Sequence, residues 1–540
     1  MAGLVATFGS GAMTNSIDEF EDADCILITG SNTTENHPLI ANRILRAKEK
    51  GAKVIVIDPR KTQIGKLSDI YARQNLGSDV AWINGLINII IKEGWYDKEF
   101  IKDRTEGFED LKAKVAEYTP EKVEKISGIP ADSLKEIAEI YARAENSSIV
   151  YCMGITQHTS GTDNVMSLAN LAMVTGNVGK RSTGVNPLRG QNNVQGACDL
   201  GALPNVFTGY QAVTNDELRA KFEKAWGVAL DGKVGQTVVE MMNNAHDGKL
   251  KGMYIMAENP LLSDPDINHV KEALDNLDFL VVQDIFMTET AQLADVVLPG
   301  TTYAEKDGTI TNSDRTVQRC RKAIDPVGNS KPDWEILSLL GQKMGISNFD
   351  YSSPEEVFKE ISELTPIYGG ISYERIDNEV LHWPCPTSDH PGTLFLHSGT
   401  FSRGLGAFKA IDYREPAELP DKDYPMQLTT GRMMFHFHTG TMTRNSPALH
   451  KEVRESYVEV SPSDAAEMGI LDNEKIKISS RRGEIEAKAK ITDKVHKGVV
   501  FIPFHFVEGA ANTLTNPVLD PVAKIPEYKV CAVKVEKIQS

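Results

Sequence analysis

A strand, a helix and a second strand follow one another between residues 24 and 60, and this pattern restricts the fold more than any other feature. Residues 24–32 read DCILITGSN, a short apolar run that ends in Gly and Asn. HPLIANRILRAKEKG has helical spacing and stops at Gly51, and AKVIVIDPR is a second apolar run broken by Pro59. Two strands joined by a helix need a crossover connection, so the sequence predicts a parallel sheet.

Similar alternation of helix and strand returns further along the chain. Leu134, Ile137, Ala138 and Tyr141 share one helical face ahead of SSIVYCMG, a predicted buried strand. A helix near INHVKEALDNL precedes the apolar runs DFLVVQD and ADVVLPG. After Tyr424 the runs MQLTTGR, SYVEVSP, EKIKISSRRGEIEAKAKIT and GVVFIPFHF alternate and carry tight turns, which indicates β structure.

We therefore predict an α/β protein in which two α/β segments with mainly parallel sheets are followed by a C-terminal β-barrel-like domain. The expected domains are a first α/β domain over residues 1–190 and a second over residues 191–310. Residues 311–410, where Pro, Gly and Asp are frequent, form a predicted connecting segment. Residues 411–540 form the predicted β domain.

Composition excludes several classes of protein. The formal net charge of −17 argues against a nucleic-acid partner, because phosphate binding needs a basic face. No apolar run approaches the roughly 20 residues that span a bilayer, and residues 1–16 lack a basic leader with an apolar core. The six cysteines are scattered without CxxC spacing, so we expect reduced thiols and a cytoplasmic protein.

Four of the predicted strands end in loops rich in Gly, Asn, Thr, Asp and Gln. Ligands of open α/β sheets bind beyond the carboxyl ends of the strands, where backbone N–H groups at helix starts are also exposed. The loops favour a polar heteroaromatic ligand that carries phosphates, although the same residue types are common in ordinary turns. The loops are TGSNTTEN (29–36), IDPRKT (57–62), CMGITQHTSG (152–161) and QDIFMTET (283–290).

Other ligand motifs are absent or weak. No GxGxxG follows the first strand and no GxxxxGK[ST] occurs, which argues against a standard dinucleotide fold and a P-loop. His436 and His438 in FHFH would point to the same side of a strand, as a metal pair or, more often, as hydrogen-bonding histidines. NPLRGQNNVQGACDLGALP (186–204) places Arg189 alone among amides, too polar and irregular for a core element.

Long segments of the chain resemble the molybdopterin oxidoreductases. ADVVLPGTTYAEKDGTITNSDRTVQ (294–318) looks like a signature of that family, and residues 457–485 resemble its C-terminal dinucleotide-binding domain. The Arg189 stretch is similar to a segment of the molybdenum- or tungsten-dependent formate dehydrogenases. The resemblance covers nearly the whole chain and implies the catalytic subunit of an enzyme that oxidises formate to CO₂.

The resemblance also implies the cofactor, in which molybdenum or tungsten is held by two molybdopterin guanine dinucleotides. One group of residues would contact one dinucleotide and its pterin: Asn32, Glu35, Asp58, Gly77, Asp79, Gly154, Gln157 and Gln191. A second group would serve the other half of the cofactor: Asn259, Ser263, Gln283 and Asp333. The β domain would close over both with Gly431, Arg432, His436, His438, Asn512, Tyr528 and Lys529. Met433 and His438 depart from the residues that close relatives often carry.

Arg189 matches the arginine that holds the substrate carboxylate in formate dehydrogenases. A guanidinium is planar and always charged, so it can bind formate through two parallel hydrogen bonds while the surrounding amides bind the pterins without adding charge. The alternative is a structural Arg189–Asp199 ion pair.

Two parts that the resemblance implies are not found in the sequence. These are a domain that binds a 4Fe–4S cluster through four spaced cysteines and a selenocysteine or cysteine that binds the metal. Met1 falls five positions past the place of that metal ligand. We expect the chain to be the downstream part of a selenoprotein gene, inactive alone, with no metal ligand of its own.

Two other functions stay open at this point. The chain could be a reductase of the same family for nitrate or a sulfur oxyanion, or a scaffold that kept the fold without the metal. For a formate dehydrogenase the expected partners are formate and an electron-transfer subunit linked to iron–sulfur or to flavin or deazaflavin. The sequence does not identify the metal or the electron acceptor.

Overall fold

The computed structural model describes residues 1–538, which form two compact units. Unit 1 consists of Met1–Gly190, Leu262–Asn268 and Phe395–Ser540 and so includes both ends of the chain. Unit 2 consists of Gln191–Leu261 and His269–Leu394.

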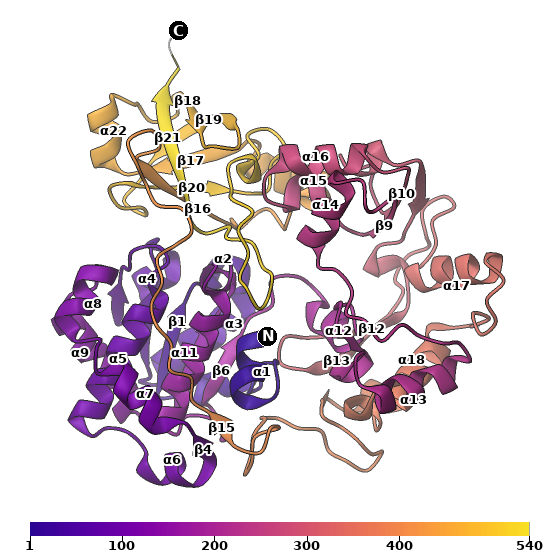
Figure 1. Cartoon of the computed structure of the whole chain (residues 1–540), viewed down its shortest axis with the longest axis horizontal. Helices are drawn as coiled ribbons and strands as arrows, with labels where there is room; N and C mark the ends of the chain where they lie inside the picture. Colours follow the sequence, from indigo (N-terminus) through magenta and orange to yellow (C-terminus); the bar gives the residue numbers. More distant parts are fainter. Residues whose placement is uncertain (539–540) are drawn as a thin grey trace. The chain divides into compact units, whose positions relative to one another are not determined.

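Unit 1 contains a parallel five-stranded sheet in the order β3-β2-β1-β5-β6 (Figure 1). Its strands are β1 (Cys25–Thr29), β2 (Lys53–Ile57), β3 (Ile70–Ala72), β5 (Ser147–Tyr151) and β6 (Gly184–Pro187). β1 is central and pairs with β2 and β5 in parallel register, Cys25 lying opposite both Lys53 and Ser147. All five residues of β1 are buried, as expected of a parallel strand covered on both faces.

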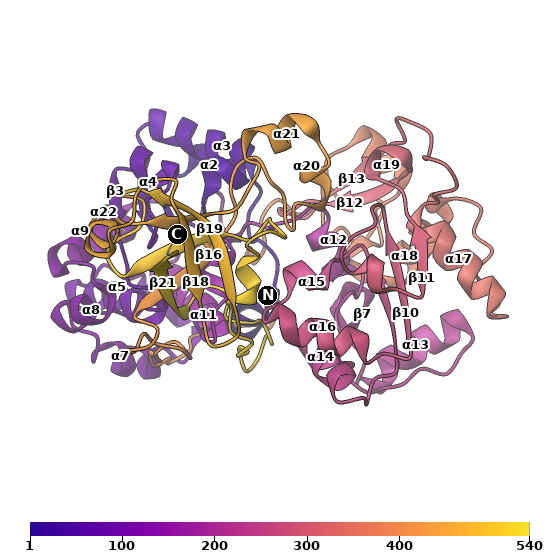
Figure 2. The same cartoon turned by 90° about the horizontal axis from the view of Figure 1, so that it is seen from above.

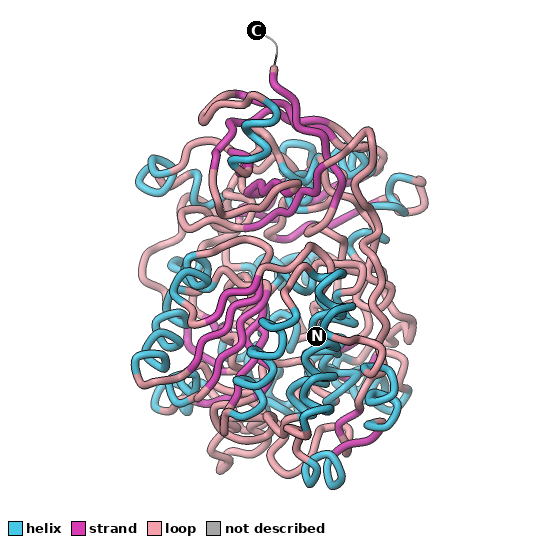
Figure 3. The backbone as a smooth tube through the Cα atoms, turned by 90° about the vertical axis from the view of Figure 1, so that its left-hand side faces the viewer, coloured by secondary structure: helices cyan, strands magenta, loops and turns pink. Residues whose placement is uncertain are grey.

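Helices cover both faces of this sheet (Figure 3). Its strands point apolar side chains to both sides, where these helices bury them. On one face, Ile26 and Ile28 pack with Ile44 of α3 (Pro38–Glu49). On the other, Leu27 packs with residues of α5 (Asp79–Glu93), α9 (Ala131–Arg143) and α11 (Gly161–Val174). Shorter helices of this part are α1 (Ala2–Phe8), α2 (Thr33–Asn36), α4 (Gln63–Leu67), α6 (Lys98–Arg104), α7 (Phe108–Val115), α8 (Pro120–Ser127) and α10 (Met153–Thr156).

The C-terminal part of unit 1 is a closed barrel (Figure 2). Its strands follow the order β16-β20-β17-β19-β18-β21. β19 shows why it closes around a core: along EIEAKAKI exposed and buried residues alternate, and Ile485, Ala487 and Ala489 point inward. The strands are β16 (Met426–Gly431), β17 (Tyr457–Val460), β18 (Lys475–Ser479), β19 (Glu484–Ile491), β20 (Val499–Pro503) and β21 (Cys531–Lys537). Helices α20 (Thr441–Arg444), α21 (Pro447–Glu452) and α22 (Pro462–Met468) lie between them in sequence.

Unit 2 contains a parallel three-stranded sheet of β9 (Gly252–Met256), β10 (Phe279–Asp284) and β11 (Val296–Pro299), in the order β11-β10-β9. Helices α14 (Val238–His246) and α16 (Ile267–Asp275) contribute to the core on one face, with Met242 and Val270 packed near Val282. The opposite face carries Tyr254 and Phe279, both of which are exposed.

The rest of unit 2 holds a small antiparallel sheet of β12 (Gly308–Thr311), β13 (Thr316–Cys320) and β14 (Leu381–His382). The helices are α12 (Val194–Asp199), α13 (Asp216–Trp226), α17 (Asp333–Lys343), α18 (Pro354–Leu364) and α19 (Tyr373–Asn378). Two further strand pairs are β4 (Thr105–Glu106) with β15 (Gly406–Ala407) in unit 1, and β7 (Val206–Phe207) with β8 (Gln211–Ala212).

The predicted fold class is confirmed: two parallel α/β sheets and a C-terminal barrel are present. The barrel begins at Met426, after an irregular stretch that follows Phe408. The region predicted to be connecting material contributes strands and helices to unit 2. Within residues 1–538, no helix combines the length and apolarity that crossing a membrane would require.

Candidate functional site

Unit 1 contains a cavity of roughly 840 Å³, counting the part open to solvent, and many of its lining residues are polar or charged. The loops after β1, β2 and β5 line it, together with the start of α5 and several barrel residues. This is the edge of a parallel sheet where ligands are expected. The cavity lining includes Gly30, Asn32, His37, Asp58, Arg60, Gln74, Gly77, Asp79, Gly154, His158, Thr430, Gly431, Arg432, Phe501 and Lys529.

Two glycines let the loops after β1 and β5 approach each other. Gly154 N–H donates to the Gly30 carbonyl at 3.0 Å. A Cβ on Gly154 would lie 2.6 Å from the Gly30 backbone, and a Cβ on Gly30 would lie 2.4 Å from Ile155 N. Gly30 also has a positive φ of 56°. Both positions therefore require glycine, for space and, at Gly30, for conformation.

Three cations border the cavity. Arg60, buried, binds Glu459 of β17 through two hydrogen bonds of 2.6 and 2.7 Å and lies over the Phe501 ring at 4.1 Å. Lys529 donates to the Thr430 carbonyl at 2.7 Å, and burial lowers its pKa to about 8. Burial also lowers the pKa of Arg432. Positive charge is thus concentrated where it could meet an anionic ligand.

Two buried carboxylates lie at the same cavity. Asp58 accepts from Arg60 N–H at 2.9 Å, and burial raises its pKa to about 6. Asp79, at the start of α5, accepts from Gln74 at 3.0 Å and from the Trp82 indole at 3.3 Å. Burial raises the pKa of Asp79 to about 7, and nearby Asp58 contributes to this rise. Perturbed acids in a cavity are typical of a binding site.

Five buried polar atoms on residues that line this cavity have no hydrogen-bond partner in the described part of the chain. They are Asn32 Nδ2, His37 Nδ1, Gln74 Oε1, His158 Nδ1 and Arg432 Nε. Buried polar groups are nearly always paired, so these atoms fit a polar ligand with several donors and acceptors. The residues present therefore fit a nucleotide-containing cofactor with a pterin.

Eight of the residues predicted for the cofactor line the cavity: Asn32, Asp58, Gly77, Asp79, Gly154, Gly431, Arg432 and Lys529. Others of unit 1 do not line it: Glu35, Gln157, Ser263, His436, His438, Asn512 and Tyr528. Three of these form one cluster, because Asn512 donates to the Ser263 carbonyl at 3.0 Å and Tyr528 OH donates to it at 3.0 Å.

Arg189 follows β6 and is half-buried in unit 1. Its Nη2 donates to the Gly11 carbonyl at 3.5 Å, and the His37 ring bonds to its backbone carbonyl through Nε2 at 2.7 Å. Asp199 accepts from Gln195 at 2.7 Å, from Tyr210 at 2.6 Å and from Tyr368 at 2.8 Å, all in unit 2.

The prediction that His436 and His438 share one side of a strand is wrong. β16 ends at Gly431, and both histidines lie in the irregular stretch that follows. His438 has a positive φ of 46°, which no strand allows. His436 bonds to Thr443 at 3.0 Å and to the Val453 carbonyl at 2.7 Å, so its ring holds this loop together. No group of three His, Cys, Asp or Glu within residues 1–538 could hold a metal ion.

In unit 2 the structure joins Gln283 and Asp333, because the Gln283 amide donates to Asp333 at 2.7 Å. Asn259 accepts from Thr290 Oγ1 at 2.7 Å and donates to Glu289 at 2.8 Å. Gln191 lies in the turn before α12.

The family-like segment 294–318 has structural roles in unit 2. Glu305 caps a short helical turn by accepting from Thr302 N–H and Oγ1 at 2.8 and 2.9 Å. Arg315 is fully buried and donates to the carbonyls of Trp383, Thr393 and Leu394.

Several cavity residues were not predicted from the sequence: His37, Arg60, Gln74, His158 and Phe501. Arg60 and His158 lie in the loops 57–62 and 152–161 that follow predicted strands. Their positions in the sequence could therefore have identified them as site residues. Gln74 and Phe501 carry no such signal, because only the tertiary structure brings them to the loop ends.

The fold and cavity define an α/β and β-barrel protein with a cavity whose polar and charged side chains fit a polar, phosphate-bearing cofactor. Residues 4–343 match the family described as molybdopterin oxidoreductase, and residues 426–532 match the molydopterin dinucleotide binding domain. The chain therefore belongs to the molybdopterin oxidoreductase family.

Individual relatives agree with this family. The chain is 55% identical over 542 residues to F420-dependent formate dehydrogenase 1 subunit alpha of Methanococcus maripaludis, covering 100% of this chain and 80% of that protein. It is 41% identical to formate dehydrogenase H of Escherichia coli, covering 100% of this chain and 76% of that protein. The acetylene hydratase structure from Pelobacter acetylenicus matches with a TM-score of 0.79 at 22% identity, over 99% of this chain and 80% of that one, which supports the fold alone.

Proposed function

We propose that the chain acts in the catalytic subunit of a formate dehydrogenase, which oxidises formate to CO₂ at a molybdenum or tungsten centre with two pterin guanine dinucleotides. The observation that carries the proposal is the cavity of unit 1. It combines two buried carboxylates, three cations and several unpaired buried polar atoms. The identity to formate dehydrogenase alpha subunits supports formate as the substrate.

Each group of the cavity has a suitable role toward a guanine dinucleotide. A carboxylate such as Asp58 or Asp79 can accept hydrogen bonds from the guanine ring N–H and the exocyclic amine together. Arg432 and Lys529 can neutralise the pyrophosphate, whereas the Arg60 charge is already paired with Glu459. Asn32 Nδ2 then gains a partner that residues 1–538 do not supply.

Arg189 is the proposed substrate-binding residue. Its guanidinium would hold the formate carboxylate through two hydrogen bonds and fix the direction of the C–H bond. His37 holds the Arg189 backbone from the cavity wall. The metal centre, when bound, would supply an acceptor for the two electrons of formate. Gln191, Asn259, Gln283 and Asp333 remain proposed contacts to the second dinucleotide.

We further propose a partner subunit that carries the electrons away, linked to iron–sulfur or to flavin or deazaflavin. The names of two relatives, which describe a subunit alpha of an F420-dependent enzyme, support a further subunit. A 4Fe–4S cluster would belong to a polypeptide region outside the matched residues. The six free cysteines are consistent with a cytoplasmic enzyme.

A titration of the purified 540-residue chain tests the nucleotide site. Guanosine diphosphate should bind at least tenfold more tightly than adenosine diphosphate, because adenine lacks the paired donors that a carboxylate recognises. Equal affinities would contradict the guanine assignment. For the reaction, the cofactor-loaded full-length subunit should reduce a dye with formate and should not oxidise a reduced dye with nitrate; the reverse result would favour a nitrate reductase.

A further inference from the structure

Two buried carboxylates of the segment between the barrel strands β20 and β21 contact the start of α11. Asp520 accepts from Thr162 N–H at 2.9 Å and from Thr162 Oγ1 at 2.8 Å. Glu527 accepts from Thr159 N–H at 3.2 Å and from Thr159 Oγ1 at 3.1 Å. Both carboxylates are 1% exposed. Anionic groups at the start of a helix are stabilised by the free N–H groups and by the helix dipole.

The turn that they contact is a wall of the cavity. Gly154 and His158 line the cavity, and the His158 ring bonds to the Gly154 carbonyl through Nε2 at 2.9 Å. Glu527 Oε1 lies 3.9 Å from His158 Nδ1. Thr159, which Glu527 binds, directly follows His158. The position of this wall therefore depends on Glu527 from its outer side.

Glu527 also adjoins the barrel residues at the cavity. Tyr528 and Lys529 follow it, and Lys529 lines the cavity while its ammonium donates to the Thr430 carbonyl. Thr430 Oγ1 donates to the Tyr528 carbonyl at 2.9 Å. Glu527 thus connects the two cavity walls: its carboxylate binds the loop after β5, and its backbone leads directly to Lys529 on the barrel side.

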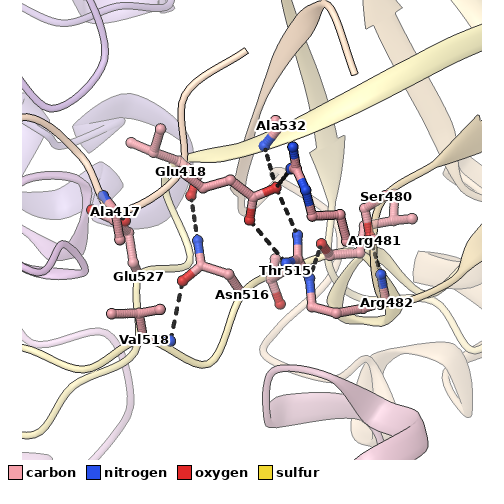
Figure 4. A network of polar contacts seen from close by, with 12 residues as sticks. Ala417, Glu418, Ser480, Arg481, Arg482, Thr515, Asn516, Val518, Glu527 and Ala532 are labelled. Carbon is pink, nitrogen blue, oxygen red and sulfur yellow. Dashed lines mark hydrogen bonds and ion pairs between the residues drawn. The ribbon is translucent and has the colours of Figure 1, made fainter. Parts of the chain in front are cut away.

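The second oxygen of Glu527 holds the segment that leads into the barrel. Oε2 accepts from Ala417 N–H at 3.0 Å. The next residue, Glu418, has a different set of partners (Figure 4): Arg481 at 2.6 Å, Arg482 at 2.8 Å and Ala532 N–H at 3.2 Å. Glu418 is nearly as well buried, with 12% of its side chain exposed, and all of these partners belong to the barrel.

We propose that Glu527 is a positioning residue that fixes the Gly154–His158 wall against the cavity-lining barrel residues Thr430 and Lys529 and so slows release of the bound dinucleotide. The effect on release rests on the proposed cofactor, whereas the effect on the cavity walls does not. Glu418 is its matched control, because its carboxylate binds barrel residues and forms no hydrogen bond or ion pair with residues 153–162 in the described structure.

Hydrogen exchange of the cofactor-free 540-residue chain tests the geometry without the cofactor. Glu527→Gln should raise the exchange rate of the amides of residues 153–164 at least tenfold, because the neutral amide presents an NH₂ group to donors that need acceptors. Glu418→Gln should leave these amides within about twofold of wild type while it lowers Tm. Unchanged exchange in Glu527→Gln, or equal increases in both variants, would overturn the proposal.

Cofactor release tests the functional part in the loaded full-length subunit. After gel filtration, the pterin released over time is measured by its fluorescence upon oxidation. Glu527→Gln should release it at least tenfold faster than Glu418→Gln at equal Tm loss, and Glu527→Asp should restore part of the retention. Equal release from both Gln variants would overturn the positioning role. Faster exchange without faster release would show that the wall moves while the ligand lies elsewhere, which counts against the proposed cofactor site.

Discussion

At the scale of single residues, Arg189 carries the proposed chemistry. Arg189→Lys in the loaded full-length subunit should lower kcat/KM for formate by on the order of a hundredfold, about 3 kcal/mol, because a point charge does not fix the carboxylate through two bonds. Cofactor content should stay close to wild type, since other residues line the cavity. Normal formate turnover would contradict the substrate role. If Arg189→Lys lost its metal together with its formate turnover, Arg189 would instead be a cofactor contact.

Asp79 gives a pH prediction for the cofactor-free chain. Burial raises its pKa to about 7, so the folded chain keeps a proton that the unfolded chain releases above about pH 4. Its contribution to the free energy of unfolding therefore falls as pH rises from about 4 to 7, by up to about 4 kcal/mol. Relative to wild type, Asp79→Asn should gain stability across this window, measured by urea unfolding. Parallel pH curves for the two proteins would contradict the burial effect.

The sequence placed some site residues correctly and others wrongly. Asn32, Asp58 and Gly154 stand in loops that follow obvious strands, and all three line the cavity. Their roles toward a cofactor stay predictions. His436 and His438 were misplaced on a strand, because FHFH has the alternation of one while the chain turns away from the barrel at Gly431. Alternation over four residues is too short to distinguish a strand from a loop.

At the scale of elements, the contact between the loops after β1 and β5 shapes the cavity. Gly154→Ala would place a Cβ 2.6 Å from backbone atoms of Gly30, which cannot move away as a flexible side chain would. We expect a cost of about 1–3 kcal/mol, typical of overpacking, seen as a lower Tm. Nothing lies within 4 Å of a Cβ on Gly308, so Gly308→Ala is the matched control and should change Tm little. Equal effects of both variants would contradict this reading of the contact.

The parallel strands were predictable as elements because each is a short apolar run between turn residues. β1, β2, β5, β10 and β11 all appear where such runs occur. Unit 2 was harder. Its β12–β13 hairpin and α17 lie in or beside a region where Pro, Gly and Asp hide the periodicity. Much of that region is held by buried hydrogen bonds such as those of Arg315, which leave no apolar pattern.

At the scale of the whole molecule, the Arg60–Glu459 pair joins residues 399 positions apart. Both side chains are buried, and Glu459 is fully so. Glu459→Gln would leave the Arg60 charge without its counterion and should cost about 3–5 kcal/mol, measured by chemical denaturation. Glu455→Gln, which removes an exposed pair with Lys488, should change stability by less than about 1 kcal/mol. Similar losses in both variants would contradict the role of burial.

The sequence by itself determined the fold class, because the 2.0- and 3.6-residue periods of strands and helices are local properties of the chain. It also determined the family, since the resemblance rests on long contiguous segments. Only the tertiary structure decided that the acids, cations and glycines of the cavity meet, and that Glu527 holds two of its walls together. These contacts join residues that are hundreds of positions apart, and their pKa shifts come from burial, which no local pattern specifies.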